Sequence, residues 1–147
     1  MDVAFGNLGK NFTDLSGKIY EFAQNSQEQY GISEIAARRY TGTLMSMFNS
    51  SGFDVSDKMH KEAAQMSLDL TKLSGDLASF YNISNDEAFQ KIQSGMAGMT
   101  RPLRDLGINM SVANLNAYAM SQGIAQSYSE MSQANQQMLR YSYLMSV

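Results

Sequence analysis

Apolar residues recur at alternating intervals of four and three residues between Ser56 and Asn82. This spacing places them on one face of an α-helix of about seven turns, because the helix repeats every 3.6 residues. Asn82 follows the last apolar position, where a residue in the left-handed conformation commonly ends a helix. The pattern predicts one long central helix. Its core face would consist of Met59, Ala63, Met66, Leu70, Leu73, Leu77 and Phe80.

Two more helices are predicted upstream. The first carries the same spacing and would end at Gly31; its apolar positions are Leu8, Phe12, Leu15, Ile19 and Phe22. The second would begin after Ser33, a good N-cap, and end in the turn-forming stretch at 49–54. Its expected inward residues are Ile35, Tyr40, Leu44, Met47 and Phe48. The first eighty residues therefore predict three antiparallel helices with short loops.

Shorter helices with explicit start and stop signals are predicted after Asn82. Ser84 and Glu87 have capping-box spacing, and Ala88, Phe89, Ile92 and Met96 would then face inward. Pro102 suits the first turn of a brief helix, because its missing N–H has no partner there in any case. Gly107 would end that helix.

The remaining residues predict two more helices. Ser111 would cap one that extends to Gln122 and ends at Gly123. The residues at 97–124 thus form a corner whose packing residues are Leu103, Leu106, Ile108, Leu115 and Met120. A last helix covers about 132–145, with Ala134, Met138, Tyr141 and Met145 on one side.

These elements define the expected fold class as all-α, a helical bundle of about three long and three or four short helices. We expect residues 1–147 to form one helical domain. Because the last helix reaches Val147 without a cap, we also expect the chain to be part of a longer one. The residues expected to hold the fold are the core side chains Met66, Leu70, Leu73, Leu77, Phe80, Phe89, Leu106 and Leu115 and the turn residues Pro102, Gly107 and Gly123.

Composition narrows the function classes. The chain is 44% apolar, carries a net charge of −3 with scattered basic residues, and contains no cysteine. Nucleic-acid binding normally requires a clustered basic surface, so no nucleic-acid site is expected. No window approaches about 18 consecutive apolar residues, so no membrane span is expected in this segment.

Candidate chemistry is sparse. His60 is the single histidine and has no second histidine or any cysteine with which to share a metal. Asp86 and Glu87 lie together at a helix start, where the helix dipole favours negative charge. No catalytic, cofactor-binding or metal-binding residues are assigned, and a non-enzymatic role is expected. Twelve methionines suit an adaptable core. Met45, Met99 and Met110 are instead candidates for an adaptable contact surface.

One long stretch resembles a known family. The sequence from Leu77 to Ile124, LASFYNISNDEAFQKIQSGMAGMTRPLRDLGINMSVANLNAYAMSQGI, is similar to a segment of phage tail tape measure proteins. In that family a helix ending in ASF(Y/F)N leads to an EA(F)xx(I/L) helix, to SG(L/M/I)xG and then to PL(K/R)xLGIN(M/L)(S/T)xANLxA(Y/F)A. The residues at 31–53 and 130–145 also resemble the family. Arg101 departs from it, because many relatives have an acidic residue before the proline.

The resemblance implies a structural role in a long-tailed phage or prophage. Tape measure proteins are long, mostly helical chains that occupy the growing tail tube, determine its length and leave ahead of the DNA. The implied partners are the tail tube protein, tail assembly chaperones and other tape measure copies, so a homo-oligomer is possible. The implied location is the virion tail, and the host bacterial cytoplasm during assembly.

Two other roles within the same kind of tail protein remain open. The module could be a peptidoglycan hydrolase, against which the lack of a paired acid or His/Cys site argues. It could instead contact DNA or membrane during ejection. The acidic balance and the lack of a basic amphipathic face argue against that role.

Overall fold

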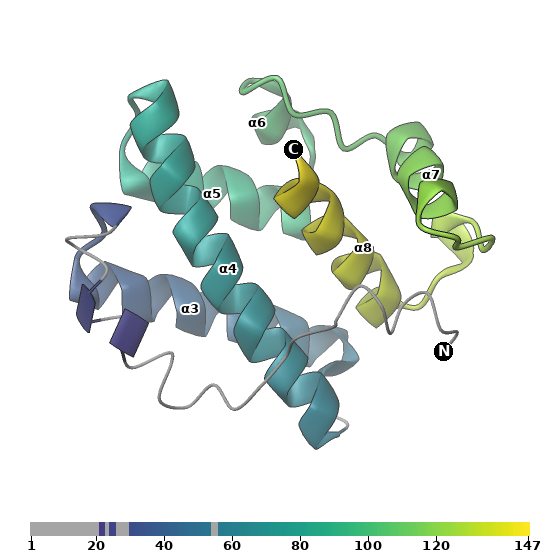
Figure 1. Cartoon of the computed structure of the whole chain (residues 1–147), viewed down its shortest axis with the longest axis horizontal. Helices are drawn as coiled ribbons and strands as arrows, with labels where there is room; N and C mark the ends of the chain where they lie inside the picture. The colour runs from purple at the N-terminus through teal and green to yellow at the C-terminus, as the bar shows by residue number, and fades with distance from the viewer. Residues whose placement is uncertain (1–20, 23, 26–29, 54–55) are drawn as a thin grey trace.

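The computed structural model describes residues 21–22, 24–25, 30–53 and 56–147, and its regular elements are all helices (Figure 1). The all-α prediction is therefore confirmed. The longer helices are α3 (Glu34–Phe48), α4 (Asp57–Tyr81), α5 (Asn85–Met96) and α8 (Gln133–Ser146). The shorter ones are α6 (Arg101–Arg104), α7 (Val112–Ser121), a π-turn η1 (Asn49–Phe53) and a 3₁₀ turn η2 (Tyr128–Glu130). The division into three long and three or four short helices fits only roughly. The helix predicted around 8–22 lies almost entirely outside the described residues.

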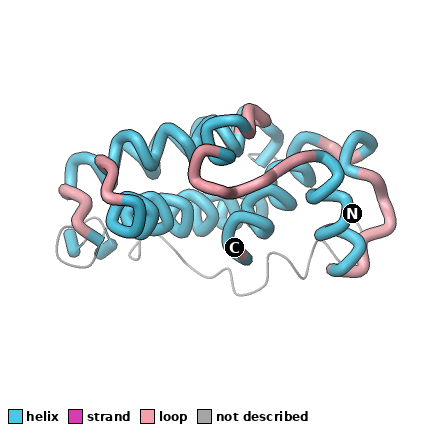
Figure 2. The backbone as a smooth tube through the Cα atoms, turned by 90° about the horizontal axis from the view of Figure 1, so that it is seen from above, coloured by secondary structure: helices cyan, strands magenta, loops and turns pink. Residues whose placement is uncertain are grey.

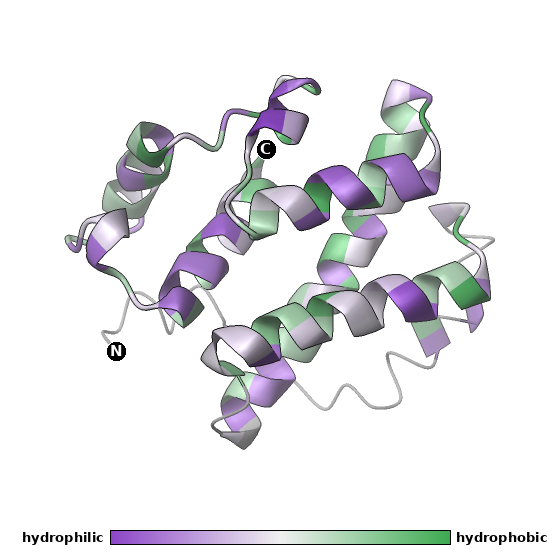
Figure 3. Ribbon diagram, turned by 180° about the vertical axis from the view of Figure 1, so that it is seen from behind, coloured by the Kyte–Doolittle hydropathy of each residue, from purple (hydrophilic) through white to green (hydrophobic). Residues whose placement is uncertain are grey.

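The central helix α4 organises the molecule. It crosses in front of α3 and α5 in Figure 1 and packs against α3, α5, η1 and α8. α7 lies at the outer edge and packs on α8 and η2. Seen from above, helices make up most of the described backbone (Figure 2), and the longer loops lie before and after α7, at 105–111 and 122–127. Polar and apolar residues share each of the longer helices, as amphipathic packing requires (Figure 3).

Serine caps begin five of the helices. Each capping hydroxyl accepts a hydrogen bond from the backbone N–H three residues later, at 3.1–3.2 Å. The capping residues are Ser33, Ser56, Ser84, Ser111 and Ser132. Asn82 ends α4 with φ 56°, and Gly107 and Gly123 follow α6 and α7 with φ near 80°. These predicted boundaries are confirmed because they depend on local backbone chemistry.

The buried face of α4 is centred to one side of the predicted core face, the row of apolar residues from Met59 to Phe80 that we call the seam. Ser67, Thr71 and Ser74 are fully buried, about a quarter turn from the predicted core positions. Their hydroxyls donate to carbonyls of the preceding turn; the Ser67 and Thr71 bonds measure 2.7 and 2.8 Å. Thr71 also lies 3.4 Å from the hydroxyl of Thr41 on α3. Small, internally satisfied side chains therefore let α3 and α4 approach closely.

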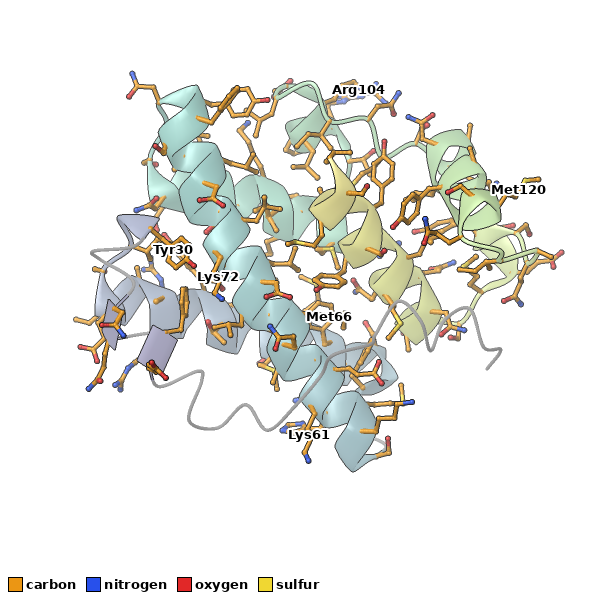
Figure 4. The ribbon with its side chains drawn as sticks, viewed as in Figure 1. Tyr30, Lys61, Met66, Lys72, Arg104 and Met120 are labelled. Carbon is orange, nitrogen blue, oxygen red and sulfur yellow. The ribbon has the colours of Figure 1, made fainter. Side chains whose placement is uncertain are left out.

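The same helix is approached by the segment before α3. A Cβ on Gly75 would lie 2.8 Å from the Tyr30 carbonyl oxygen, so only glycine fits there. Lys72 stands 5.6 Å from the ring of Phe22 and 6.0 Å from that of Tyr30, a cation–π arrangement that Figure 4 shows on this side of α4. These contacts hold residues 22 and 30 against α4.

Most predicted core residues are buried. Met66 and Leu70 are fully buried, and Phe89, Leu106 and Leu115 are 2–9% exposed. Phe80 is the main correction: its side chain is 81% exposed, so the prediction that it belongs to the core is wrong. Because the buried face is rotated from the seam, the seam lies at the edge of that face. Its later residues, Leu73 and Leu77, are accordingly only partly buried.

Four other orientations also differ from prediction. Ile35 is 81% exposed at the start of α3, and Met120 is 73% exposed because α7 packs only through the side bearing Leu115 and Ala119. Met145 is 45% exposed near the end of α8. Met110 is 2% exposed whereas Met99 is 63% exposed, so the proposed methionine contact surface does not form.

The corner at 97–124 is held by backbone-directed hydrogen bonds. The Asn109 side chain accepts from the Ser111 N–H at 3.0 Å. The Asn109 carbonyl accepts from the Asn114 amide at 3.0 Å and the Tyr143 hydroxyl at 2.8 Å. Pro102 lies in the first turn of α6, as predicted. The corner is thereby fixed to α8.

Candidate functional site: an apolar groove at the end of α4

A groove of about 400 Å³ opens where the end of α4, the loop after α6 and the end of α8 meet. We call it the α4–α8 groove. In Figure 1 these three segments converge at the upper part of the molecule. Its lining consists of Leu73, Leu77, Phe80, Tyr81, Leu106, Gly107, Ile108, Leu144 and Val147. The lining carries no charged side chain, so the groove suits an apolar occupant.

The wall opposite α4 is set by the turn after α6. The N–H groups of Leu106 and Ile108 both donate to the Leu103 carbonyl, at 2.9 and 3.1 Å. Between them Gly107 adopts φ 80°, a backbone conformation that residues other than glycine rarely adopt. The Tyr81 hydroxyl donates to the Leu106 carbonyl at 2.7 Å. This bond ties the end of α4 directly to the opposite wall.

Apolar side chains remain uncovered at the rim. Phe80 is 81% exposed, and its ring meets that of Tyr81 edge to face at 4.9 Å. The floor is more protected, since Leu144 is fully buried and Leu106 is 9% exposed. The groove therefore combines a buried base with an exposed aromatic ring in its lining.

The structure brings together only some of the residues predicted to be important. Leu73, Leu77, Phe80, Leu106 and Gly107 line the groove. The other predicted residues lie elsewhere: Met66, Leu70, Phe89 and Leu115 are core, and Pro102 and Gly123 serve separate turns. The sequence analysis named neither Tyr81 nor Leu144, and it expected Ile108 only as a packing residue of the corner. The adjacent aromatics at 80–81, directly before a left-handed cap, were the available signal.

A polar cluster joins α3 to α5. The carboxylate of Asp86 accepts hydrogen bonds from Arg39, at 2.7 Å, and from the hydroxyl of Tyr40. Tyr40 also stacks on Phe89 with ring centroids 4.1 Å apart. Burial and the Asp86 hydrogen bond raise the pKa of Tyr40 to about 12. Its contacts are those of a structural clamp between two helices.

Two contacts fix α8. The Tyr141 hydroxyl donates to Asp69 of α4 at 2.6 Å, and burial followed by that contact raises the pKa of Tyr141. Arg140 donates to the Met96 carbonyl at 2.7 Å, satisfying a carbonyl at the C-terminal end of α5 where positive charge is favoured. These contacts hold the floor of the α4–α8 groove in place.

The residues considered for acid–base or metal chemistry are dispersed. His60 is exposed, and Asp86 and Glu87 lie at the exposed start of α5. Within the described residues, no three His, Cys, Asp or Glu side chains gather as a possible metal set. Glu62 is a buried carboxyl on α4, and burial raises its pKa although Lys58 opposes the shift.

Across the part of the chain that the structure describes, no helix has both the length and the apolar character needed to cross a membrane. No protein-family model, curated protein or solved structure matches the chain.

Proposed function

We propose that the chain is a structural module of a phage tail tape measure protein, a component of the tail of a long-tailed phage or prophage. The resemblance of residues 77–124 to that family carries the proposal. Its partners would be the tail tube protein, tail assembly chaperones and other copies of the protein. It would act in the virion tail after assembling in the bacterial cytoplasm.

The contacts made by the residues at 77–124, which resemble the family, support a structural role. Within 77–124, Gly107 reverses the chain, Asn109 and Ser111 fix the corner, and Tyr81 ties that corner to α4. These side chains direct backbone or join helices. The role proposed for the segment is therefore to set the relative position of helices rather than to perform chemistry.

Tail assembly provides the test. In a phage or prophage encoding this chain, Gly107→Val should yield tail-less or misassembled particles, because valine strains the left-handed turn at residue 107. Arg104→Ala is the matched control three residues away. Arg104 is exposed, and its replacement should leave complete tails. Electron microscopy of purified particles distinguishes these outcomes.

The opposite pattern would contradict the proposal. Normal tails with Gly107→Val, together with complete but non-infectious virions with Arg104→Ala, would make the corner a contact site used after assembly. Clearing of a bacterial cell-wall suspension by the purified chain would favour the hydrolase alternative. Salt-dependent DNA binding would favour the ejection alternative.

A further inference from the structure

A polar cleft lies beside the first half of α8, away from the α4–α8 groove. It has a volume of about 470 Å³ and opens between η1, the end of α5 and α8. We call it the η1–α8 cleft. Among the lining residues that the structure describes, one carries a charge, and it is positive. The polar residues of the lining are Ser50, Ser51, Gln133, Gln136, Gln137 and Arg140.

The side-chain amide of Gln137 leaves a hydrogen-bond acceptor unused at this cleft. The Ser51 hydroxyl donates to the Met47 carbonyl at 3.1 Å, so it can only accept from Gln137, whose Nε2 donates to it at 3.2 Å. This direction leaves Oε1 of Gln137 as the free end of the amide. The side chain is 5% exposed, and Oε1 accepts no hydrogen bond from the described residues. A buried acceptor of this kind favours a ligand that brings a donor.

The guanidinium of Arg140 is held in place and keeps further donors for a ligand. It donates to the Met96 carbonyl at 2.7 Å, and its Cζ lies 5.4 Å from the centre of the Tyr128 ring. Arg140 is partly buried, and within the described part of the chain no carboxylate oxygen lies within 4 Å of its nitrogen atoms. The forked donors of arginine match the two oxygens of a carboxylate. Arg140 is therefore positioned to bind one.

We propose that the η1–α8 cleft binds an acylated amino acid with a free carboxylate, either as a small molecule or as the last residue of a peptide. The carboxylate pairs with Arg140, and the amide N–H of the ligand donates to Oε1 of Gln137. The two residues are three positions apart on α8, so they share one face with Cβ atoms about 5–6 Å apart. One carbon separates the N–H from the carboxylate in an amino acid, so a single residue can reach both side chains.

The lining favours this ligand over a simple inorganic anion. An anion that offers only acceptors would pair with Arg140 but would leave Oε1 of Gln137 without a donor. Met47 and Ala97 add apolar atoms to the wall, against which an acyl group can pack. The expected ligand therefore combines a negative charge, a hydrogen-bond donor and a short apolar part.

NMR titration of the isotopically labelled chain with three small probes tests the proposal. N-Acetylglycine carries both recognised groups, acetate carries only the carboxylate, and N-acetylglycinamide carries only the amide. N-Acetylglycine should shift the side-chain signals of Gln137 and Arg140 and should bind most tightly. The other two probes should bind about tenfold more weakly or not at all, because each lacks one of the two contacts.

Two variants separate the contacts. Gln137→Met keeps the length of the side chain but removes the acceptor, so the Kd of N-acetylglycine should rise about threefold to tenfold while that of acetate stays unchanged. Arg140→Gln keeps a donor for the Met96 carbonyl but removes the charge, so both carboxylates should lose binding. Gln122→Met is the matched control, because Gln122 is exposed in the loop after α7. Circular dichroism should show that all three variants keep their helices.

The outcomes decide the proposal and the source of the ligand. No binding of N-acetylglycine at high millimolar concentration, or binding that Arg140→Gln leaves unchanged, would overturn it. Equal affinities for acetate and N-acetylglycine would also overturn it, because Gln137 would then contribute nothing. Tighter binding of an acetylated tripeptide with a free carboxylate would identify a peptide C-terminus as the ligand, and equal binding would identify a small molecule. The inference is independent of the proposed tail function.

Discussion

Two alanine substitutions on one seam of α4 should have very different effects on stability. Leu70 is fully buried, so Leu70→Ala should lower the free energy of unfolding by about 2–5 kcal/mol through lost burial and a residual cavity. Phe80 is 81% exposed, so only about a fifth of its surface is buried. That fifth corresponds to roughly 40 Å², worth about 1 kcal/mol. The better helix propensity of alanine offsets about half of it.

Urea unfolding followed by circular dichroism measures the difference. The expected result is a large decrease in the midpoint for Leu70→Ala and a small one for Phe80→Ala. Similar losses from the two substitutions would refute the reasoning, because they would place Phe80 in the folding core.

Three further predictions concern single residues. Gly75→Ala should destabilise the fold, because the added Cβ would lie 2.8 Å from a backbone oxygen. A Cβ at Gly42 would meet nothing within 4 Å, so Gly42→Ala should stabilise the fold by about 0.5–1 kcal/mol. Thermal unfolding of the two variants measures the difference. Gly107→Val should cost about 1–3 kcal/mol in urea unfolding from strain at φ 80°, and Arg104→Ala less than about 0.5 kcal/mol. The folded-state pKa of Glu62 is raised, so its stabilising contribution is full below the unfolded pKa and is lost as pH rises through the folded pKa. Glu62→Gln should therefore stabilise the chain at pH 7 and lose that advantage in acid; an unchanged difference between the two pH values would contradict the assignment.

Helix boundaries were predictable because they depend on neighbouring residues. A serine N-cap accepts a hydrogen bond from a backbone amide only three residues later, and a glycine ends a helix directly after its last turn. Both signals involve only residues that are close together in the sequence. Ser111 and Gly107 accordingly lie where the sequence predicted, at the start of α7 and after α6.

The orientation of α4 was harder to predict because hydropathy undervalues its buried face. Ser67, Thr71 and Ser74 read as polar positions, yet each hydroxyl donates to a carbonyl one turn earlier and is fully buried. Small residues let two helices pack closely, so the face that carries them can be buried while the larger apolar residues of the seam lie at the edge of the helix contact. The exposure of Phe80 follows from that rotation.

The groove could not be predicted from one segment. Its lining comes from three parts of the chain, around residues 73–81, 106–108 and 144–147, which the corner and α8 bring together. The sequence identified Leu73, Leu77 and Leu106 as packing residues. Nothing in the sequence indicates that the space between these residues stays open, because that depends on how the three segments are positioned in the folded chain.

Tail length provides the most direct test of the tape measure proposal. The coding sequence for this chain would be duplicated in frame in a phage or prophage that encodes it, and tails would be measured by electron microscopy. The account predicts longer tails with unchanged tube diameter, by up to roughly 220 Å if all 147 residues extend as a helix inside the tube. Tails of unchanged length containing the duplicated protein would contradict a role in setting tail length.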